Sequence, residues 1–267
     1  MTKITMDKND RLFLFGYGLF ETLKVTSSGI ELPVSHWQRM NQGGQLLGLM
    51  VPPYQEWLDQ IHAFLGQQTS VYPYALRVTL SGGSPAHEIQ PQLFFNTREI
   101  PYTSQDYEQG FRVIFLSAPR SENSILNKIK STNYLENILA REQALTSQAQ
   151  EGLWINTQGY LAEGTISNVF FLKEDVLYTP SLDCGCLAGT RRKVVLQLAS
   201  DLGISVQEGK YQHSLLREAD QVFLTNALLG IMPVSQIDNQ PKKIQSKMLN
   251  LIMDEYKKHV KRMTCLN

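Results

Sequence analysis

A polar, turn-rich stretch divides this chain into two regions whose hydrophobic patterns differ. The stretch is RSENSILNK, which begins at Arg120, and it makes residues 119–124 the candidate linker. Before it, short apolar runs alternate with helical patterns; after it, one helical pattern leads into a series of apolar runs joined by turns. This mixture predicts an α+β protein with two unequal lobes. We expect a smaller N-terminal α/β lobe over residues 1–118 and a larger C-terminal lobe over residues 125–267.

Local signals predict the elements of the first region. The stretch RLFLFGYGLFETLKV predicts two strands that are interrupted by Gly16 and Gly18. Ser35 and Gln38 have the spacing of a capping box, so a helix is predicted to begin near His36. Further strands are predicted in YALRVTLSGG, PQLFFNTREIP and FRVIFLSAP, and a second helix in YQEWLDQIHAFLGQ.

The helix after the linker is predicted to be buried. Asn133 and Glu136 have the positions of an N-cap and of the third helical residue. One helix face is apolar and consists of Leu135, Ile138, Leu139 and Leu145. Strands joined by turns follow, with helices predicted in GTRRKVVLQLASDLG and QSKMLNLIMDEYKKHV.

The charge balance excludes two classes of partner. Lys and Arg together number 25, Asp and Glu number 25, and the formal net charge is +0, whereas binding to nucleic acid or to an anionic membrane needs a basic excess. No apolar run approaches a membrane span, and MTKITMDKND lacks the apolar core of a signal peptide. Cys184 and Cys186 have no second ligand pair for a metal, and the odd cysteine count is no disulfide framework. We expect a cytoplasmic protein without a metal.

Two lysines stand just before the helical pattern that follows the linker. Lys128 and Lys130 are either two solvated charges on a turn, or one of them is an amine nucleophile. The residues downstream bear on this choice.

Three places in the sequence could bind an anion. Gly189 and Thr190 open a helix in LAGTRR, and a strand ends at Asn226 and Ala227 in TNALLG. Backbone N–H groups at such positions bind anions. Arg39, one turn into its predicted helix, could fork onto a phosphate. Taken singly, each is an ordinary turn residue or surface charge; together with a pre-helical lysine they predict a phosphate site.

A carboxylate joins this set in the stretch YLAEGTISNVFF. Glu163 lies between an apolar strand and a Gly-Thr step, and Ser167 and Asn168 follow it. A buried carboxylate needs a partner. Glu163 is therefore either a capping or salt-bridging residue, or the partner of a cationic ring nitrogen.

Seven stretches, in order, resemble the class IV aminotransferase family of fold-type IV pyridoxal-phosphate enzymes. They are FGYGLFETLKV, HWQRM, LRVTLSGG, KSTNYLENILAREQA, GYLAEGTISNVFFL, LYTPSLDCGCLAGTRRKV and ADQVFLTNALLGIMPV. The resemblance runs from about Leu14 to Val234. It implies the two-lobed fold of D-amino acid aminotransferase-like enzymes, pyridoxal 5'-phosphate (PLP) as cofactor, and a homodimer with the site near the interface and both lobes contributing.

The resemblance also implies roles for the catalytic residues. Lys130 corresponds to the Schiff-base lysine, because it stands three residues before Asn133 in the family's K-x-x-N pattern. Lys128 has no family role. Thr22 lies near the substrate face of the pattern, where it or Lys130 would deliver a proton, and Tyr134 falls near a tyrosine that touches the ring hydroxyl.

The implied cofactor contacts form a larger set. Glu163 would pair with the pyridine nitrogen, and the others would supply hydrogen bonds or close the phosphate cup. The full set is Lys130, Tyr134, Arg39, Glu163, Ser167, Asn168, Thr190, Arg191, Asn226 and Ala227.

Departures from the family pattern bear on the substrate. Gly16-Tyr17-Gly18 stands where Gly-Asp-Gly is common, and helix entry is Gly-Thr-Arg-Arg rather than Gly-Ile-Thr-Arg. The loop SGGSPAHEIQPQ has no arginine, only His87, which weakens the D-amino-acid branch. Arg77, Arg98 and Arg120 remain candidates for the residue that binds the substrate carboxylate.

The step TNALLGIMPV favours the lyase branch, whose members act on a small amino substrate, 4-amino-4-deoxychorismate, and release pyruvate and 4-aminobenzoate. Two alternatives stay open at this point: a branched-chain or D-amino acid transaminase of the same family, and a non-catalytic member of the fold. An intact set of Lys130, Glu163 and Arg39 argues against the last.

Overall fold

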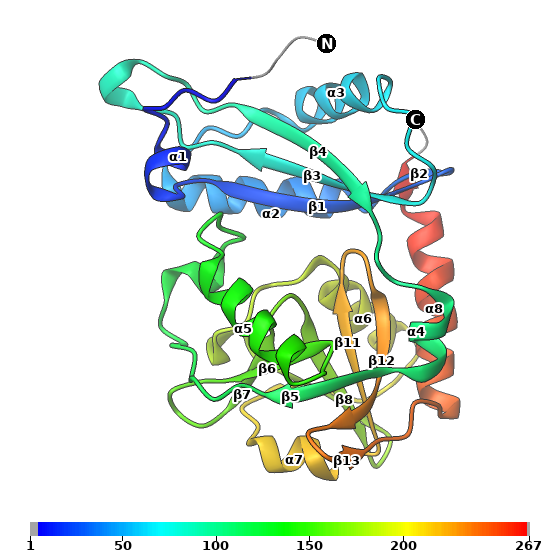
Figure 1. The fold of residues 1–267 in the computed structure, drawn as a ribbon. Helices are drawn as coiled ribbons and strands as arrows, with labels where there is room; N and C mark the ends of the chain where they lie inside the picture. The colour runs from blue at the N-terminus through cyan, green and yellow to red at the C-terminus, as the bar shows by residue number, and fades with distance from the viewer. Residues whose placement is uncertain (1–4, 266–267) are drawn as a thin grey trace. The chain divides into compact units, whose positions relative to one another are not determined.

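The structure is a computed structural model that describes residues 5–265, and these residues form two compact units (Figure 1). Unit 1 comprises the described residues up to Ile100, Ile129–Tyr134, and those from Val260 onward. Unit 2 comprises Pro101–Lys128 and Leu135–His259.

Unit 1 is built on an antiparallel sheet whose strand order, within the described residues, is β14-β2-β1-β3-β4. Its elements are α1 Arg11–Phe15, β1 Leu19–Thr26, β2 Gly29–Glu31, α2 Pro33–Leu47, α3 Tyr54–Leu65, β3 Tyr74–Leu80, η1 Pro85–His87, β4 Leu93–Glu99 and β14 Thr264–Cys265. Leu19, Leu23 and Val25 of β1 are buried and belong to a core with Trp57 and Ile61 of α3. Side chains alternate across a strand, so the other face of β1 carries Phe20, Thr22 and Lys24.

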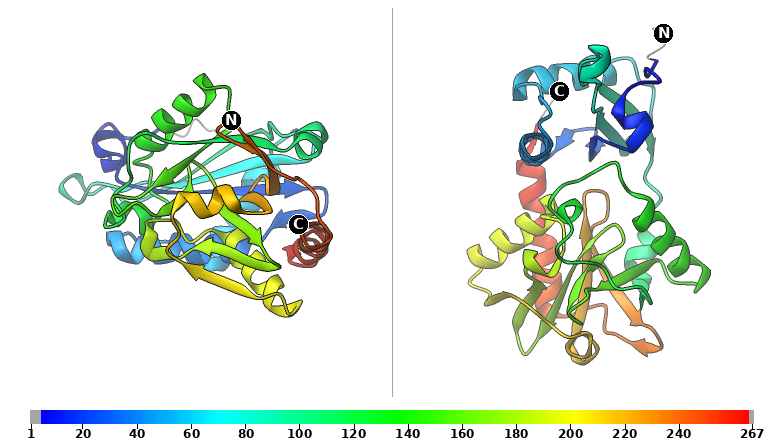
Figure 2. Two further views of the ribbon diagram at one scale, coloured as in Figure 1. Left: turned by 90° about the horizontal axis from the view of Figure 1, so that it is seen from below. Right: turned by 90° about the vertical axis from the view of Figure 1, so that its left-hand side faces the viewer.

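Unit 2 contains a mixed sheet with the described order β10-β9-β8-β11-β12-β5-β6-β7, and β13 pairs with β12. Its elements are α4 Ser104–Gln109, β5 Phe111–Phe115, η2 Ile125–Lys128, α5 Leu135–Thr146, β6 Glu151–Ile155, β7 Leu161–Gly164, β8 Asn168–Lys173, β9 Val176–Pro180, η3 Leu182–Cys184, α6 Thr190–Asp201, β10 Val206–Gly209, α7 His213–Glu218, β11 Gln221–Asn226, β12 Gly230–Ile237, β13 Gln240–Pro241 and α8 Lys247–Arg262, whose last residues are counted with unit 1. α5 packs on β6 and α6 packs on β11, and the two helices lie on different sides of the strands (Figure 2).

The start of the chain corrects one prediction. The apolar run Arg11–Phe15 is a short helix, not a strand. The side chain of Asp10 accepts a hydrogen bond from Leu12 N–H at the N-terminus, and Gly16 ends the helix at φ 63°. The two caps have only five residues between them, which leaves room for little more than one helical turn, and they outweigh the strand propensity of the apolar residues.

The helix predicted near His36 begins earlier, at Pro33. Pro33 occupies the first helical turn, where its missing N–H costs nothing. The N-cap is Leu32 in a left-handed conformation with φ 53°, and it provides no side-chain cap. Ser35 therefore lies inside the helix, and Ser35 and Gln38 form no capping box.

The division into units differs from the predicted lobes. The polar segment at residues 119–124 lies within unit 2, because β5 before it pairs with β6 and β12 of the same sheet. Residues 129–134, which include Lys130, belong to unit 1 and not to the C-terminal lobe. Polarity marked a surface loop correctly, but strand pairing over a long sequence distance decides the boundary.

The apolar face predicted to be buried on α5 is exposed. Leu135, Ile138, Leu139 and Leu145 are each at least 48% exposed, whereas Asn137, Ala140 and Ala144 face inward. The helix begins at Leu135, so Glu136 is its second residue rather than its third. Small residues let α5 approach β6 closely, and the larger apolar residues are left outside.

No helix within residues 5–265 has both the length and the apolar composition that a membrane crossing requires.

Candidate active site

The segment that carries Lys130 is fixed to the start of β1. Phe20 N–H donates to the Lys130 carbonyl over 2.9 Å, and Thr132 N–H donates to the Gly18 carbonyl over 3.0 Å. The side-chain amide of Asn133 donates to the Gly16 carbonyl over 2.8 Å. The backbone on both sides of Lys130 is therefore held, although the segment has no regular secondary structure of its own.

The amine of Lys130 lies over aromatic rings. Its Nζ is 4.4 Å from the centroid of the Phe20 ring and 5.5 Å from that of Tyr134. The two rings meet edge to face, with centroids 5.2 Å apart. The rings hold the amine by cation–π attraction and by apolar contact with its stem. Lys128, two residues earlier, is exposed.

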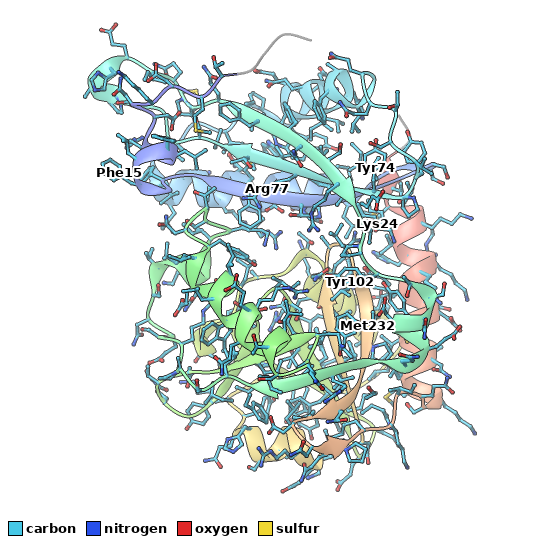
Figure 3. The ribbon with its side chains drawn as sticks, viewed as in Figure 1. Phe15, Lys24, Tyr74, Arg77, Tyr102 and Met232 are labelled. Carbon is cyan, nitrogen blue, oxygen red and sulfur yellow. The ribbon has the colours of Figure 1, made fainter. Side chains whose placement is uncertain are left out.

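A second cation shares the Phe20 ring. The Arg77 guanidinium carbon lies 3.7 Å from that centroid, and Arg77 is on β3, directly opposite Thr22 (Figure 3). Burial lowers the pKa of Arg77; Tyr134 acts in the opposite direction and Arg98 in the same one. Arg77 donates to Thr79 Oγ1 over 3.2 Å and forms no ion pair within the described residues. A cation that could bind a carboxylate thus contacts the same aromatic ring as the amine.

Arg39 is held by a buried carboxylate. Its Nε and one terminal nitrogen donate to the two oxygens of Glu21 over 2.8 and 2.6 Å. His36 Nδ1 lies 2.6 Å from Glu21 Oε2, and Glu21 and His36 are both fully buried. Burial alone would raise the pKa of Glu21, but Arg39 and His36 lower it to about 2. The predicted contact of Arg39 with a phosphate stays a prediction.

In unit 2, Glu163 is a buried carboxylate with several donors. Its Oε1 lies 3.1 Å from a terminal nitrogen of Arg120. Its Oε2 accepts from Leu187 N–H over 2.9 Å and from the Asn168 amide over 3.4 Å. Glu163 is therefore salt-bridged, and the arrangement gives its carboxylate a fixed direction.

The loop after Glu163 is held by another buried carboxylate, that of Glu151. Its oxygens accept from Thr165 N–H over 3.0 Å, from Ile166 N–H over 3.3 Å and from the Ser167 hydroxyl over 2.8 Å, and also from the Thr165 hydroxyl. Because the Ser167 proton is donated to Glu151, Ser167 can only accept a further hydrogen bond. Its predicted hydrogen bond to the cofactor stays a prediction.

The two parts of the predicted phosphate cup are tied together in unit 2. Gly189 is the N-cap of α6 and provides no side-chain cap. The buried side chain of Arg191 reaches across and donates to the Ala227 carbonyl over 3.1 Å. Asn226 accepts from the N–H groups of Leu228 and Leu229 and so shapes the turn. The N–H groups of the first helical turn, at Thr190 and Arg191, are suited to an anion.

Asn168 joins the cup to Glu163. Its amide donates to the Leu187 carbonyl over 2.9 Å as well as to Glu163. A Cβ at Gly189 would lie 1.9 Å from Asn168 Oδ1, so only glycine fits there. Asn226 donates to the Ile166 carbonyl over 3.3 Å and completes the link.

The structure thus assembles the predicted residues in two sets. Unit 1 contains Lys130, Tyr134, Thr22 and Arg39, and unit 2 contains Glu163, Ser167, Asn168, Thr190, Arg191, Asn226 and Ala227. Sequence reasoning missed Phe20, Glu21, Glu151 and the pairing of Arg120. Glu21 interrupts an apolar run, which is the signal that could have revealed a buried carboxylate; Glu151 only precedes an apolar run and gives no such signal.

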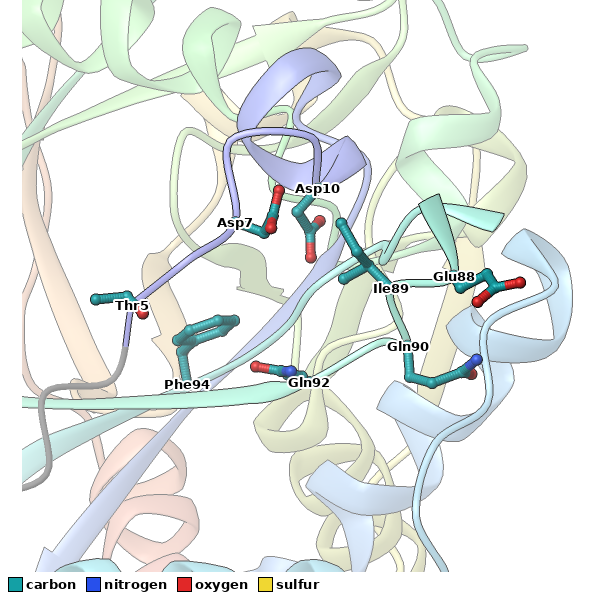
Figure 4. A pocket seen from close by; sticks show the side chains of 8 residues that line it. All are labelled: Thr5, Asp7, Asp10, Glu88, Ile89, Gln90, Gln92 and Phe94. Carbon is teal, nitrogen blue, oxygen red and sulfur yellow. The ribbon is translucent and has the colours of Figure 1, made fainter. Parts of the chain in front are cut away.

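Unit 1 also contains a cavity of about 460 Å³ that the predicted site residues do not line (Figure 4). Asp7, Asp10 and Glu88 are among its lining residues. Three carboxylates would repel a phosphate or a carboxylate substrate.

Cys184 and Cys186 are buried thiols in unit 2. Burial, and then the charge of Glu163, raise the pKa of Cys186 to about 12. Burial likewise raises the pKa of Cys184. Both remain protonated near neutral pH, so neither is a ready nucleophile or metal ligand.

The chain belongs to the amino-transferase class IV family, whose family model matches residues 18–237. This match covers both units and confirms the α+β, fold-type IV architecture that the sequence predicted.

Three similar proteins carry two kinds of name. The chain is 28% identical to "Aminodeoxychorismate lyase" of Bacillus subtilis, over 95% of this chain and 89% of that one. It is 29% identical to a "D-alanine aminotransferase" of Listeria monocytogenes, over 88% and 83%. A solved structure from Legionella pneumophila, named "Putative 4-amino-4-deoxychorismate lyase", superimposes with a TM-score of 0.89 at 29% identity and covers 96% of each chain.

Proposed function

We propose that this chain is a PLP-dependent 4-amino-4-deoxychorismate lyase, which releases pyruvate and the folate precursor 4-aminobenzoate. The observation that carries the proposal is the placement of the Lys130 amine and the Arg77 guanidinium on one aromatic ring. An amine that can exchange protons, next to a cation that can bind a carboxylate, suits a substrate with an amino group and carboxylates. Similarity to two proteins that bear this lyase name supports it.

The residues present fit the proposed cofactor. The N-terminus of α6 has no side-chain cap at Gly189, so the N–H groups of its first turn are suited to a phosphate. Glu163 is a fixed carboxylate suited to a ring nitrogen, and Lys130 would attach the cofactor covalently. When bound, PLP supplies an electron sink for the carbon next to the substrate nitrogen.

Lys130 is the proposed base and acid. In this proposal its amine takes the proton from the substrate carbon that bears nitrogen and returns a proton to the departing enolpyruvyl group. Thr22 lies on the same strand face as Phe20, and its hydroxyl is the proposed alternative to Lys130 for delivering this proton. Aromatisation of the product ring supplies driving force, so the protein chiefly supplies position.

Arg77 is the proposed site for a substrate carboxylate. Arg120 is committed to Glu163, and Arg98 is exposed on β4. Of the three candidates this leaves Arg77, which contacts the same Phe20 ring as Lys130. The substrate of the lyase carries two carboxylates, and a guanidinium can bind one of them through two parallel hydrogen bonds.

A transaminase of D-amino or branched-chain amino acids is the second candidate. Similarity to a D-alanine aminotransferase favours it, and it would use the same lysine. Against it stands the loop at residues 81–92, which contains no arginine for a substrate carboxylate.

We also propose that the chain is a homodimer. The exposed apolar face of α5 supports this, because a contiguous apolar patch on a helix is typical of an interaction site. Light scattering on wild type and Leu139→Lys would test it. A dimeric wild type and a monomeric, folded variant are expected; a monomeric wild type would contradict the proposal.

The lyase proposal is tested by the fluorescence of 4-aminobenzoate released from 4-amino-4-deoxychorismate generated in situ. Wild type, Lys130→Ala and Lys128→Ala form the set, with Lys128 as the matched control because it is exposed and two residues away. Product is expected from wild type and Lys128→Ala only. If the wild type binds PLP but yields no product, the lyase proposal fails, and amino-acid half-reactions then test the transaminase.

A further inference from the structure

Arg120 was a candidate for the substrate carboxylate, but it is buried and turned toward Glu163. Only 6% of the residue is exposed. One terminal nitrogen lies 3.1 Å from Glu163 Oε1, and its guanidinium carbon lies 5.7 Å from the Trp154 ring centroid. A buried guanidinium with a buried carboxylate at this distance is an ion pair shielded from water.

Further contacts fix the direction of the Arg120 side chain. Its Nε donates to Asn127 Oδ1 over 2.8 Å, and the Asn127 amide donates to the Ser121 carbonyl over 2.7 Å. Asn127 is itself buried. The segment predicted as a linker therefore folds back on itself and supports the guanidinium.

The backbone of Arg120 is held as well. Its N–H donates to the Ile155 carbonyl over 2.9 Å, and its carbonyl accepts from Thr157 N–H over 3.1 Å. β6 ends at Ile155, and β7 begins at Leu161 and carries Glu163. The backbone of Arg120 is thus bonded at the end of β6, and Glu163 lies on β7, which pairs with β6.

The groups in contact with Glu163 within unit 2 include one cation, two neutral donors and a thiol. Arg120 is the cation at Oε1. Asn168 from β8 and Leu187 N–H are neutral donors at Oε2. Cys186, whose pKa the charge of Glu163 raises, is a protonated thiol. Of these four groups, Arg120 supplies the positive charge.

We infer that Arg120 is a positioning residue, which keeps Glu163 an anion and directs its carboxylate before any cofactor arrives. The inference rests on the proposed function only for the identity of the ring that Glu163 meets. A carboxylate so held can keep a proton on a ring nitrogen, whereas a protonated Glu163 could not. A guanidinium, unlike an ammonium, also bonds to Asn127 while it pairs with Glu163.

The first test uses the full-length chain without added cofactor. The carboxyl groups of glutamate are labelled with ¹³C, and the Glu163 resonance is assigned from its loss in Glu163→Gln. We expect Arg120→Met to move the Glu163 titration midpoint upward by about 1–3 pH units, the size of the effect of a neighbouring arginine on a carboxyl group. Arg120→Lys keeps the charge and should restore most of the shift.

The control is Arg217→Met, which removes a half-exposed arginine that pairs with Asp238 over 2.7 Å in the same unit. It should leave the Glu163 midpoint unchanged. An unchanged midpoint in folded Arg120→Met would overturn the inference. Should Arg120→Met fail to fold, Asn127→Ala replaces it, and the inference then requires a smaller upward shift; no shift would overturn it.

The second test adds PLP labelled with ¹⁵N in the ring. Wild type should bind PLP with the ring nitrogen protonated, and Arg120→Met should show a shift toward the neutral nitrogen and weaker binding by at least about tenfold, which corresponds to one pH unit of linkage. Binding of PLP with an unchanged ¹⁵N shift in Arg120→Met would overturn the inference. A wild type that binds no PLP would remove the proposed function, while the ¹³C titration would still decide the role of Arg120.

Discussion

Glu21 in unit 1 and Glu151 in unit 2 are both buried carboxylates, but their partners differ. Glu21 is held by two side chains that can be cationic, Arg39 and His36. Glu151 is held by hydroxyl and backbone N–H donors of Thr165, Ile166 and Ser167. The first arrangement joins a helix to a strand through charge, and the second shapes a loop through neutral donors.

Glu163 combines the two arrangements, with a guanidinium on one oxygen and neutral donors on the other. Neutralising a carboxylate that is held by cationic side chains is expected to cost more stability than neutralising one that is held by neutral donors.

The largest effect is expected for Glu21→Gln. This change removes the fully buried carboxylate that contacts both Arg39 and His36, and breaking a buried ion pair costs about 3–5 kcal/mol. Chemical denaturation measures the loss of unfolding free energy. The matched control is Glu31→Gln, whose ion pair with Lys24 spans 3.8 Å at partly exposed side chains and should cost about 0–1 kcal/mol. Equal losses in the two variants would contradict the account.

The pH dependence of wild-type stability should reveal the same network. Because the pKa of Glu21 is about 2 in the folded chain and 4.5 when unperturbed, its contribution is fully present above pH 4.5 and is lost as the pH falls toward 2. The loss amounts to about 3 kcal/mol, from about 1.4 kcal/mol per unit of pKa. Unfolding measured from pH 5 to 2 should show a steeper decline in wild type than in Glu21→Gln. Parallel curves would contradict it.

Glu151→Gln tests the other arrangement. The glutamine amide places a donor where Thr165 or Ser167 already donates, and an unsatisfied buried group costs about 1–3 kcal/mol. No charge pair is broken, so the loss should be smaller than that of Glu21→Gln. Chemical denaturation of the two variants at pH 7, with PLP titration beside it, measures this. A loss as large as that of Glu21→Gln would contradict the account.

The smallest effect on stability is expected for Arg77→Gln, because Arg77 makes no ion pair within the described residues. Its effect should fall on the substrate: KM is expected to rise about tenfold or more, from the loss of a charged hydrogen bond of about 1.5–3 kcal/mol. Steady-state kinetics and thermal unfolding measure the two effects. Arg98→Gln, on the neighbouring exposed position, is the control. A lower Tm with unchanged KM would assign Arg77 to structure.

Local sequence signals predicted most strands and helices, because their periodicity and turn residues are local. They failed in two places. At the start of the chain, the local caps Asp10 and Gly16 outweigh the strand propensity of the apolar run, and the leucines of α5 are exposed because Asn137 and two alanines face the sheet instead. The residues in GYLAEGTISNVFF and GTRRKV were singled out as carboxylate and anion-site candidates, and the roles that the resemblance gave them stay predictions. The pairing of Glu163 with Arg120 could not be predicted from the sequence, because Arg120 lies 43 positions earlier and reaches Glu163 only through the folded strand pair.

The central claim is that Lys130, and not its neighbour Lys128, carries the chemistry. Borohydride reduction of the PLP-loaded chain, followed by peptide mass spectrometry, tests it most directly. The two lysines must be separated by fragmentation, because they lie two residues apart. We expect the mass of the reduced cofactor on Lys130 alone, in wild type and in Lys128→Ala, and none in Lys130→Ala. Cofactor mass on Lys128, or on a different lysine while Lys130 stays unmodified, would contradict the account.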